Sequence, residues 1–167
     1  MKLITVCGLV FCMGLGVSFG QDSKFSALFI LNFAKYIGWP SSAGQGDFVI
    51  TVLGDDPAFG QLQSMSSESK IGEQSIVVNK SMNLDKIEKC NILFISSDMS
   101  NLLASAQAKF ASSNVLIVTN KEGLGKQGAG INLVTENGKL TFEINVESLK
   151  KNGLTAKPAL FKLGKTI

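Results

Sequence analysis

Apolar runs alternate along the chain with segments of helical periodicity, and this alternation predicts the fold class. Four short apolar runs read as strands, at 48–53, 75–79, 92–96 and 115–119. The intervening segments read as two helices and a brief helical turn, at 58–66, 99–111 and 84–88. Strands that are apolar throughout are typical of a parallel sheet covered on both faces, and the helices between them supply the crossovers. We therefore predict a three-layer α/β/α sandwich with a mostly parallel central sheet.

The pattern changes after Thr119. A glycine-rich segment at 122–130 leads to two strands, at 131–135 and 139–145, separated by Glu136-Asn137-Gly138. Asn-Gly between two β-type runs is the strongest short-range hairpin signal, so a C-terminal β-hairpin completes the predicted sheet. The glycine-rich segment lacks the strand and helix context of a phosphate loop and is interpreted as a flexible loop. Short helices are expected at 146–151 and 157–165, the second with Leu160 and Leu163 directed inward.

The first helix, expected over 23–37, is apolar around most of its circumference. Its polar side chains form a narrow stripe at Lys24, Asn32 and Lys35, whereas a surface helix needs an apolar face of little more than about 100°. The helix is therefore either enclosed within the domain or covered by a partner on its second side. Trp39-Pro40 ends it, and Trp39 serves either as an interface anchor or as a plug at the end of the core. The residues assigned to a partner or dimer interface are Phe25, Leu28, Phe29, Asn32, Tyr36 and Trp39.

Polar residues at the carboxyl ends of the strands are candidates for a ligand site, because ligands of open α/β sheets lie beyond these ends. In the hairpin, Glu143 and Asn145 share one strand face, with Asn132 expected beside them. These groups form either a ligand-binding cluster or ordinary turns and a solvated outer face, since Gly, Asp, Asn and Ser dominate turns for local reasons. The possible ligand-binding residues are Gly54, Asp55, Ser96, Asn120, Glu143 and Asn145.

The N-terminus has the layout of a secretory signal. Lys2 precedes an apolar run from Leu3 to Phe19, and Ser18-Phe19-Gly20 places small residues ahead of a cleavage point after Gly20. An uncleaved membrane anchor is the alternative, but the run holds three glycines and is shorter than the roughly 20 residues that a spanning helix needs. We predict a signal peptide at 1–20 and a single α/β domain at 21–167.

Missing residue types exclude several functions. The chain has no histidine and all of its 16 basic residues are lysines, which removes histidine-based acid–base catalysis, Ser-His-Asp and Cys-His nucleophiles, and histidine metal sites. The lysines are scattered and the net charge is +3, so no nucleic-acid partner is expected. No catalytic residue, cofactor or metal ligand is assigned.

Cys90 is the only cysteine after the predicted cleavage point, so the remaining chain forms no internal disulfide. It is interpreted as a buried thiol at the start of a strand, since burial in apolar surroundings makes a thiol inert. A disulfide between two chains is left open.

Several segments, taken in order, resemble the YfiR family (the DUF4154 domain). FSALFILNFAKYIGWP at 25–40 is similar to the family's opening helix, and FVITVLGDDP at 48–57 to its first strand and Gly-Asp-Pro turn. KCNILFIS at 89–96 is similar to the family's Cys-His-Ile-Leu-Phe-Ile segment, with Asn91 where His is usual. The segments VLIVTN, GAGINLV, KLTFEIN and NGLTAKPALFKLG complete the match. The additional cysteines of some members and the frequent arginines of the family are missing from this chain.

The resemblance implies regulation rather than catalysis. YfiR-like proteins are small periplasmic proteins of Gram-negative bacteria with a three-layer α/β fold, and they commonly dimerise. The best understood bind the periplasmic sensor portion of an inner-membrane diguanylate cyclase and hold it inactive, which adjusts cyclic-di-GMP and biofilm formation. The chain is therefore expected to be a periplasmic, homodimeric repressor of such a protein, in agreement with the partner surface that its first helix requires. The alternatives are a small-molecule-binding envelope protein that serves another receptor, and an enzyme of unknown type.

Overall fold

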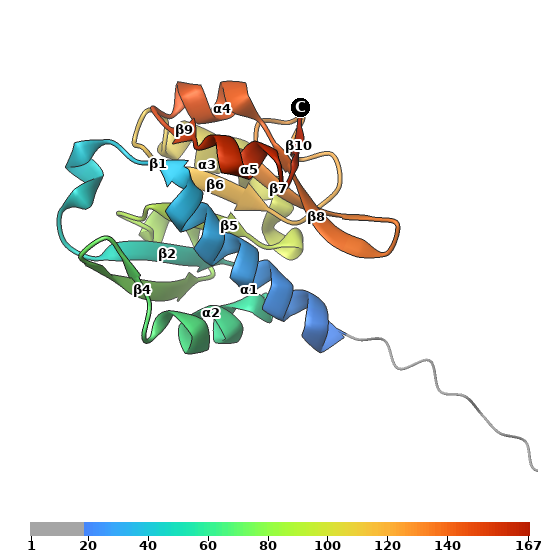
Figure 1. Ribbon diagram of the computed structural model, residues 1–167, viewed down its shortest axis with the longest axis horizontal. Coiled ribbons are helices and arrows are strands. Elements are labelled where there is room, and N and C mark those ends of the chain that lie inside the picture. The colour runs from blue at the N-terminus through green and yellow to red at the C-terminus, as the bar shows by residue number, and fades with distance from the viewer. Residues whose placement is uncertain (1–18) are drawn as a thin grey trace, which may run out of the picture.

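The computed structural model describes residues 19–167, and an eight-stranded sheet organises them (Figure 1). Across the sheet the strands lie in the order β10 (Lys165–Thr166), β8 (Lys139–Ile144), β7 (Ile131–Glu136), β6 (Leu116–Thr119), β5 (Ile92–Ile95), β2 (Phe48–Leu53), β4 (Gln74–Ser81) and β3 (Lys70–Ile71). The five strands from β4 to β7 pair in parallel, β7 and β8 form an antiparallel hairpin, and β10 lies parallel to β8. The predicted fold class, a mostly parallel sheet with a C-terminal hairpin, is confirmed.

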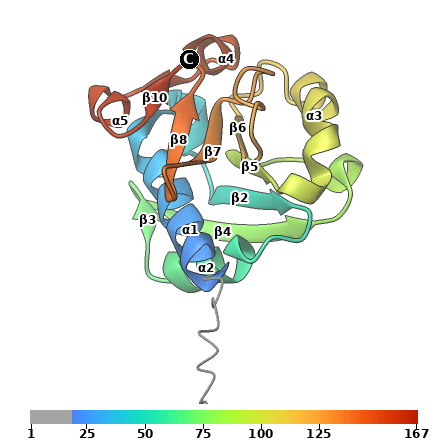
Figure 2. The same cartoon turned by 90° about the vertical axis from the view of Figure 1, so that its right-hand side faces the viewer.

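Helices cover both faces of this sheet (Figure 2). One hydrophobic cluster joins α1 (Phe19–Tyr36), α2 (Ala58–Ser66), α4 (Val146–Lys151) and α5 (Pro158–Phe161) to one face. The second cluster joins η2 (Leu84–Lys86), α3 (Leu103–Lys109) and flanking loops to the other face. Alternation along β2 separates the clusters, because Ile50 and Val52 belong to the first and Leu53 to the second.

The first helix extends further toward the N-terminus than expected, since α1 begins at Phe19. The predicted cleavage point after Gly20 would remove its first two residues, and the rest of the predicted signal peptide, residues 1–18, lies outside the described part of the chain. Among residues 19–167 no helix has the length and apolar character needed to cross a membrane.

A two-stranded ribbon fastens the end of α1 to the C-terminal part of the chain. β1 (Ile37–Gly38) pairs antiparallel with β9 (Thr155–Ala156). The Lys157 backbone N–H then donates to the Tyr36 carbonyl at 2.9 Å. The chain enters η1 (Ser41–Gly44) after Pro40.

Two helix predictions are wrong in part. The helix expected over 99–111 is divided into η3 (Ser97–Leu102), a 3₁₀ helix, and the shorter α3. The first of these contains Ser97, Asp98, Ser100 and Asn101, types whose side chains compete with the helical backbone for hydrogen bonds. The helix expected over 157–165 ends at Phe161, and the chain turns at Gly164, where a Cβ would overlap the Phe142 ring, to enter β10. Leu160 is buried as predicted, but Leu163 is 59% exposed.

The glycine-rich segment at 122–130 is packed onto the molecule rather than free. Leu124 and Ala129 are buried in the second cluster. The Asn145 side-chain amide donates to the Gly125 carbonyl at 2.9 Å, and the Ser148 hydroxyl donates to the Gly128 carbonyl at 2.6 Å. The loop therefore holds a fixed position at the carboxyl end of β6.

Candidate functional site

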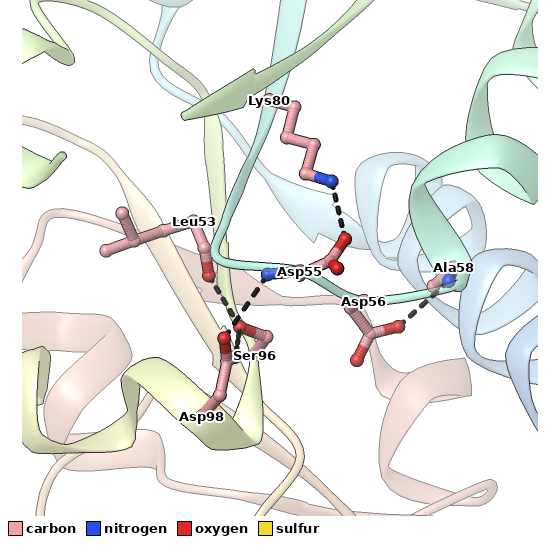
Figure 3. A network of polar contacts seen from close by, with 7 residues as sticks. All are labelled: Leu53, Asp55, Asp56, Ala58, Lys80, Ser96 and Asp98. Atoms are coloured by element: carbon pink, nitrogen blue, oxygen red, sulfur yellow. Dashed lines mark hydrogen bonds and ion pairs between the residues drawn. The ribbon is translucent and has the colours of Figure 1, made fainter. Parts of the chain in front are cut away.

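The first group of predicted ligand residues lies at the carboxyl ends of β2 and β5, called here the β2–β5 edge (Figure 3). The Ser96 hydroxyl is buried and lies within hydrogen-bond distance of both the Leu53 carbonyl, at 2.8 Å, and the Asp98 carboxylate. The second Asp98 oxygen accepts the Asp55 backbone N–H at 3.4 Å. The hydrogen bond from Ser96, with a smaller contribution from the Asp55 N–H, holds the pKa of Asp98 below its ordinary value.

The remaining polar groups at the β2–β5 edge are also bonded to each other. Lys80 and Asp55 form an ion pair at 2.5 Å. One Asp56 oxygen accepts the Ala58 backbone N–H at 2.8 Å, at the start of α2, and the other accepts the Asn120 side-chain amide at 2.9 Å. Gly54 has φ +105°, and a Cβ there would overlap Ser96. The arrangement favours the interpretation of Gly54, Asp55 and Ser96 as turn chemistry.

The second group lies at the ends of β6, β7 and β8, called here the β6–β8 edge. Asn132 is fully buried between two partners, since its Oδ1 accepts the Thr119 hydroxyl at 2.7 Å and its Nδ2 donates to Glu143 at 3.1 Å. Register explains the second contact, because Asn132 and Glu143 are paired across the hairpin. The predicted neighbourhood of Asn132 and Glu143 is thus present, and a buried amide orients the half-buried Glu143 carboxylate.

Asn145 forms no hydrogen bond with this pair among the bonds of the described residues. β8 ends at Ile144, and the Asn145 side chain accepts the Ser148 backbone N–H at 2.9 Å, which makes it the N-cap of α4. Its amide nitrogen is bonded to Gly125, so both polar atoms of the side chain serve the local fold. β8 is one residue shorter than predicted, but Gly125 lies against both side chains, since Asn145 donates to its carbonyl and a Cβ on it would meet Glu143.

Glu143 faces a cleft of about 440 Å³, called here the acidic cleft. It lies between the N-terminal half of α1, the end of β6 and the β7–β8 hairpin, and its carboxylates belong to Asp22, Glu122, Glu136 and Glu143. Asn120 also lines it, and the buried Oδ1 of this residue has no hydrogen-bond partner in the part of the chain that the structure describes. Asp22 and Glu122 are not among the predicted ligand residues, because tertiary packing alone brings these separate segments together.

The outward face of α1 exposes Phe25 and Leu28 beside Lys24 and Lys35. The other interface candidates on this helix are Phe29, Asn32 and Tyr36, and of these Phe29 and Tyr36 pack against the first cluster. Phe25 is 43% and Leu28 42% exposed, whereas the other three are half-buried. The opposite side of the helix is anchored in the first cluster, where Phe33 packs edge-on against Phe142 with ring centroids 4.9 Å apart. The helix is therefore held rigidly while two large apolar side chains remain accessible.

Trp39, the sixth interface candidate, closes the end of the core. Its ring meets Phe48 edge-on with centroids 5.1 Å apart, and its Nε1–H donates to the Ala34 carbonyl at 2.9 Å. These contacts favour the interpretation as a plug, although the ring remains half-buried.

Cys90 is buried at the start of β5. Burial raises the pKa of its thiol to about 12, against the smaller opposing effects of a hydrogen bond to Thr51 and the charge of Lys109. The thiol is therefore neutral and poorly nucleophilic near neutral pH. Within residues 19–167, no set of three His, Cys, Asp or Glu side chains is placed to hold a metal ion.

Fold and surface together define an α/β protein that presents a rigid, partly uncovered helix. Residues 23–165 match the family model DUF4154, described as YfiR/HmsC-like, and the chain belongs to this family. A search of curated proteins found no match. At Asn91, where His is usual in the family, the buried side chain accepts the Val49 backbone N–H at 2.8 Å and so links β5 to β2.

Proposed function

We propose that this chain is a periplasmic regulatory protein that binds the sensor region of an inner-membrane diguanylate cyclase and represses it. Membership of the YfiR/HmsC-like family supports a regulatory rather than a catalytic role. In this proposal residues 1–20 are the secretory signal and residues 21–167 form the single exported domain. The outward face of α1 is the observation that carries the proposal.

Exposure of the apolar side chains on the outward face of α1 has a cost in free energy. Leaving Phe25 and Leu28 about four-tenths exposed forgoes apolar burial, and covering them with a partner would contribute about 1 kcal/mol each. Their helix is already ordered by the core beneath Ile30, Phe33 and Ala34. A partner therefore meets a preorganised surface, which lowers the entropic cost of binding.

The same face is proposed to serve a homodimer, since apolar anchors at positions 25 and 28, with the half-buried Asn32 one turn beyond Leu28, suit a second copy of α1. The cyclase sensor region and a second copy of the chain would then compete for the outward face of α1. The oligomeric state, measured by analytical ultracentrifugation with and without the cyclase sensor domain, tests that competition. A dimer that persists unchanged in the complex would place the two interfaces on different faces.

The decisive experiment measures binding of the purified chain to the purified periplasmic domain of a membrane diguanylate cyclase from the same organism. Leu28→Glu should weaken the complex by about a hundredfold, because a carboxylate would be buried without a partner. Met82→Glu is the matched control: Met82 is 56% exposed and lies outside α1, so affinity should change by less than about threefold. Full-length cyclase in membranes should regain activity in the presence of Leu28→Glu but remain repressed by Met82→Glu. Equal binding by both variants would refute the α1 interface.

A further inference from the structure

The sheet face opposite α1 contains a cleft of about 510 Å³, called here the lysine cleft. Its walls are the carboxyl end of β4 and the segment that leads from η2 to β5, and Thr51 of β2 lies between them. Its lining residues are Thr51, Asn79, Lys80, Ser81, Lys86, Ile87, Glu88 and Lys89. This volume is in the range of sites that bind metabolites, roughly 300–1,000 Å³.

The wall that carries two of these lysines is fixed to the core. Every third residue of this segment is buried, at Leu84, Ile87 and Cys90. The Lys109 ammonium donates to the Leu84 carbonyl at 3.0 Å and to the Asp85 carbonyl at 2.8 Å. Lys86 and Lys89 are also three residues apart, each directly before a buried position. Both lysines are therefore held at the exposed surface.

The charges of the cleft are only partly compensated. Lys80 lines the cleft with its backbone side only, because its ammonium lies on the α2 face of the sheet, 5.8 Å from the Phe59 ring centroid and paired with Asp55 at 2.5 Å. Lys86 and Lys89 form no ion pair among residues 19–167, although the Glu88 carboxylate lines the same cleft. The exposed side-chain amide of Asn79 adds a neutral donor. Two unpaired ammonium groups, those of Lys86 and Lys89, and the Asn79 amide therefore line a space of metabolite size.

We propose that the lysine cleft binds a small polyanion with at least two carboxylate or phosphate groups. One anionic group would lie between Lys86 and Lys89, and another near the Asn79 amide. Lysine acts as a point charge rather than a planar fork, and the chain has no arginine, so the site selects for charge more than for geometry. Binding through exposed ammonium groups is screened by salt and weakens as ionic strength rises.

The test is isothermal titration calorimetry of the chain without its signal segment, with pyrophosphate and citrate as separate probes at about 20 mM ionic strength. The double variant Lys86→Gln/Lys89→Gln should lose at least about tenfold in affinity for the bound probe. The matched control is Lys24→Gln/Lys35→Gln, which removes the same charge from exposed positions on α1 and should stay within about twofold of the wild type. Thermal unfolding of all three proteins checks that the fold is kept.

The probe that binds identifies the chemistry of the ligand. Binding of pyrophosphate alone supports a phosphate ligand, binding of citrate alone supports a carboxylate ligand, and binding of both supports selection by charge. Amide NMR shifts on addition of the bound probe should centre on Asn79, Ser81 and Lys89. The proposal is overturned if neither probe binds the wild type, if the two double variants lose affinity equally, or if the shifts centre elsewhere.

Discussion

The β2–β5 edge and the β6–β8 edge carry similar residues at the ends of neighbouring strands, yet their polar groups are used differently. At the β2–β5 edge, Ser96, Asp98, Asp55 and Lys80 are bonded to one another and Gly54 leaves no space between them. At the β6–β8 edge, the buried bonds of Asn132 end on a carboxylate that faces an open cleft. The difference teaches that residue types at strand ends do not define a binding site. The two edges differ in whether every polar group is paired within the fold or one of them, the Glu143 carboxylate, faces a cleft.

The largest test of this comparison is Gly54→Ala. Gly54 has a positive φ and a Cβ there would overlap Ser96, so we expect the free energy of unfolding to fall by about 3 kcal/mol, the sum of backbone strain and overpacking. Urea unfolding measures this change in the free energy of unfolding. The control is Gly60→Ala in α2, where a Cβ meets nothing within 4 Å and a gain of about 0.5–1 kcal/mol is expected. Similar midpoints for Gly54→Ala and the wild type would show that the β2–β5 edge is open enough to admit a ligand.

A second test is Asn132→Ala at the β6–β8 edge. It leaves the buried Thr119 hydroxyl without its acceptor and Glu143 without its donor, which should cost about 2 kcal/mol in urea unfolding. Glu143→Gln keeps an acceptor oxygen for Asn132 while it removes the charge that faces the cleft, and should cost less than about 1 kcal/mol. If the two variants lose equal stability, the Glu143 charge is part of the fold and the contrast between the edges disappears.

The smallest expected effect concerns pH and Asp98. The pKa of this carboxyl is lowered from its ordinary value of 3.8 in the folded protein, so its stabilising contribution is present above that value and is lost as the pH falls through the folded pKa. The stability difference between wild type and Asp98→Asn should therefore be largest near pH 7 and should shrink by about pH 3. Chemical unfolding at several pH values measures this. A difference that stays constant with pH would mean that Asp98 acts by packing and not by charge.

Much of the fold could be predicted from local pattern. Continuous apolar runs identified β2, β5 and β6, and Asn137-Gly138 identified the hairpin, because strand burial and turn geometry are set by neighbouring residues. β10 was missed because a two-residue strand leaves no periodic signal and depends on Gly164 lying against Phe142.

The candidate sites were less predictable than the fold. Alternation along the hairpin placed Glu143 near Asn132, since register is a local property. Lys80 was not expected beside Asp55 at the β2–β5 edge, and Asp22 and Glu122 were not expected to share a cleft with Glu143. These groups are far apart along the chain, and only packing of the layers brings them together.

The ribbon of β1 and β9 joins residues more than a hundred positions apart, Ile37 with Ala156. Closing so long a loop is a late and slow event in folding, because its entropic cost comes before the contacts that offset it. The end of α1 is therefore fastened only after residues 155–157 have been synthesised. A protein built in this way has the end of α1 fully fixed only when residues 155–157 are present, and a copy cleaved before them would lack that constraint.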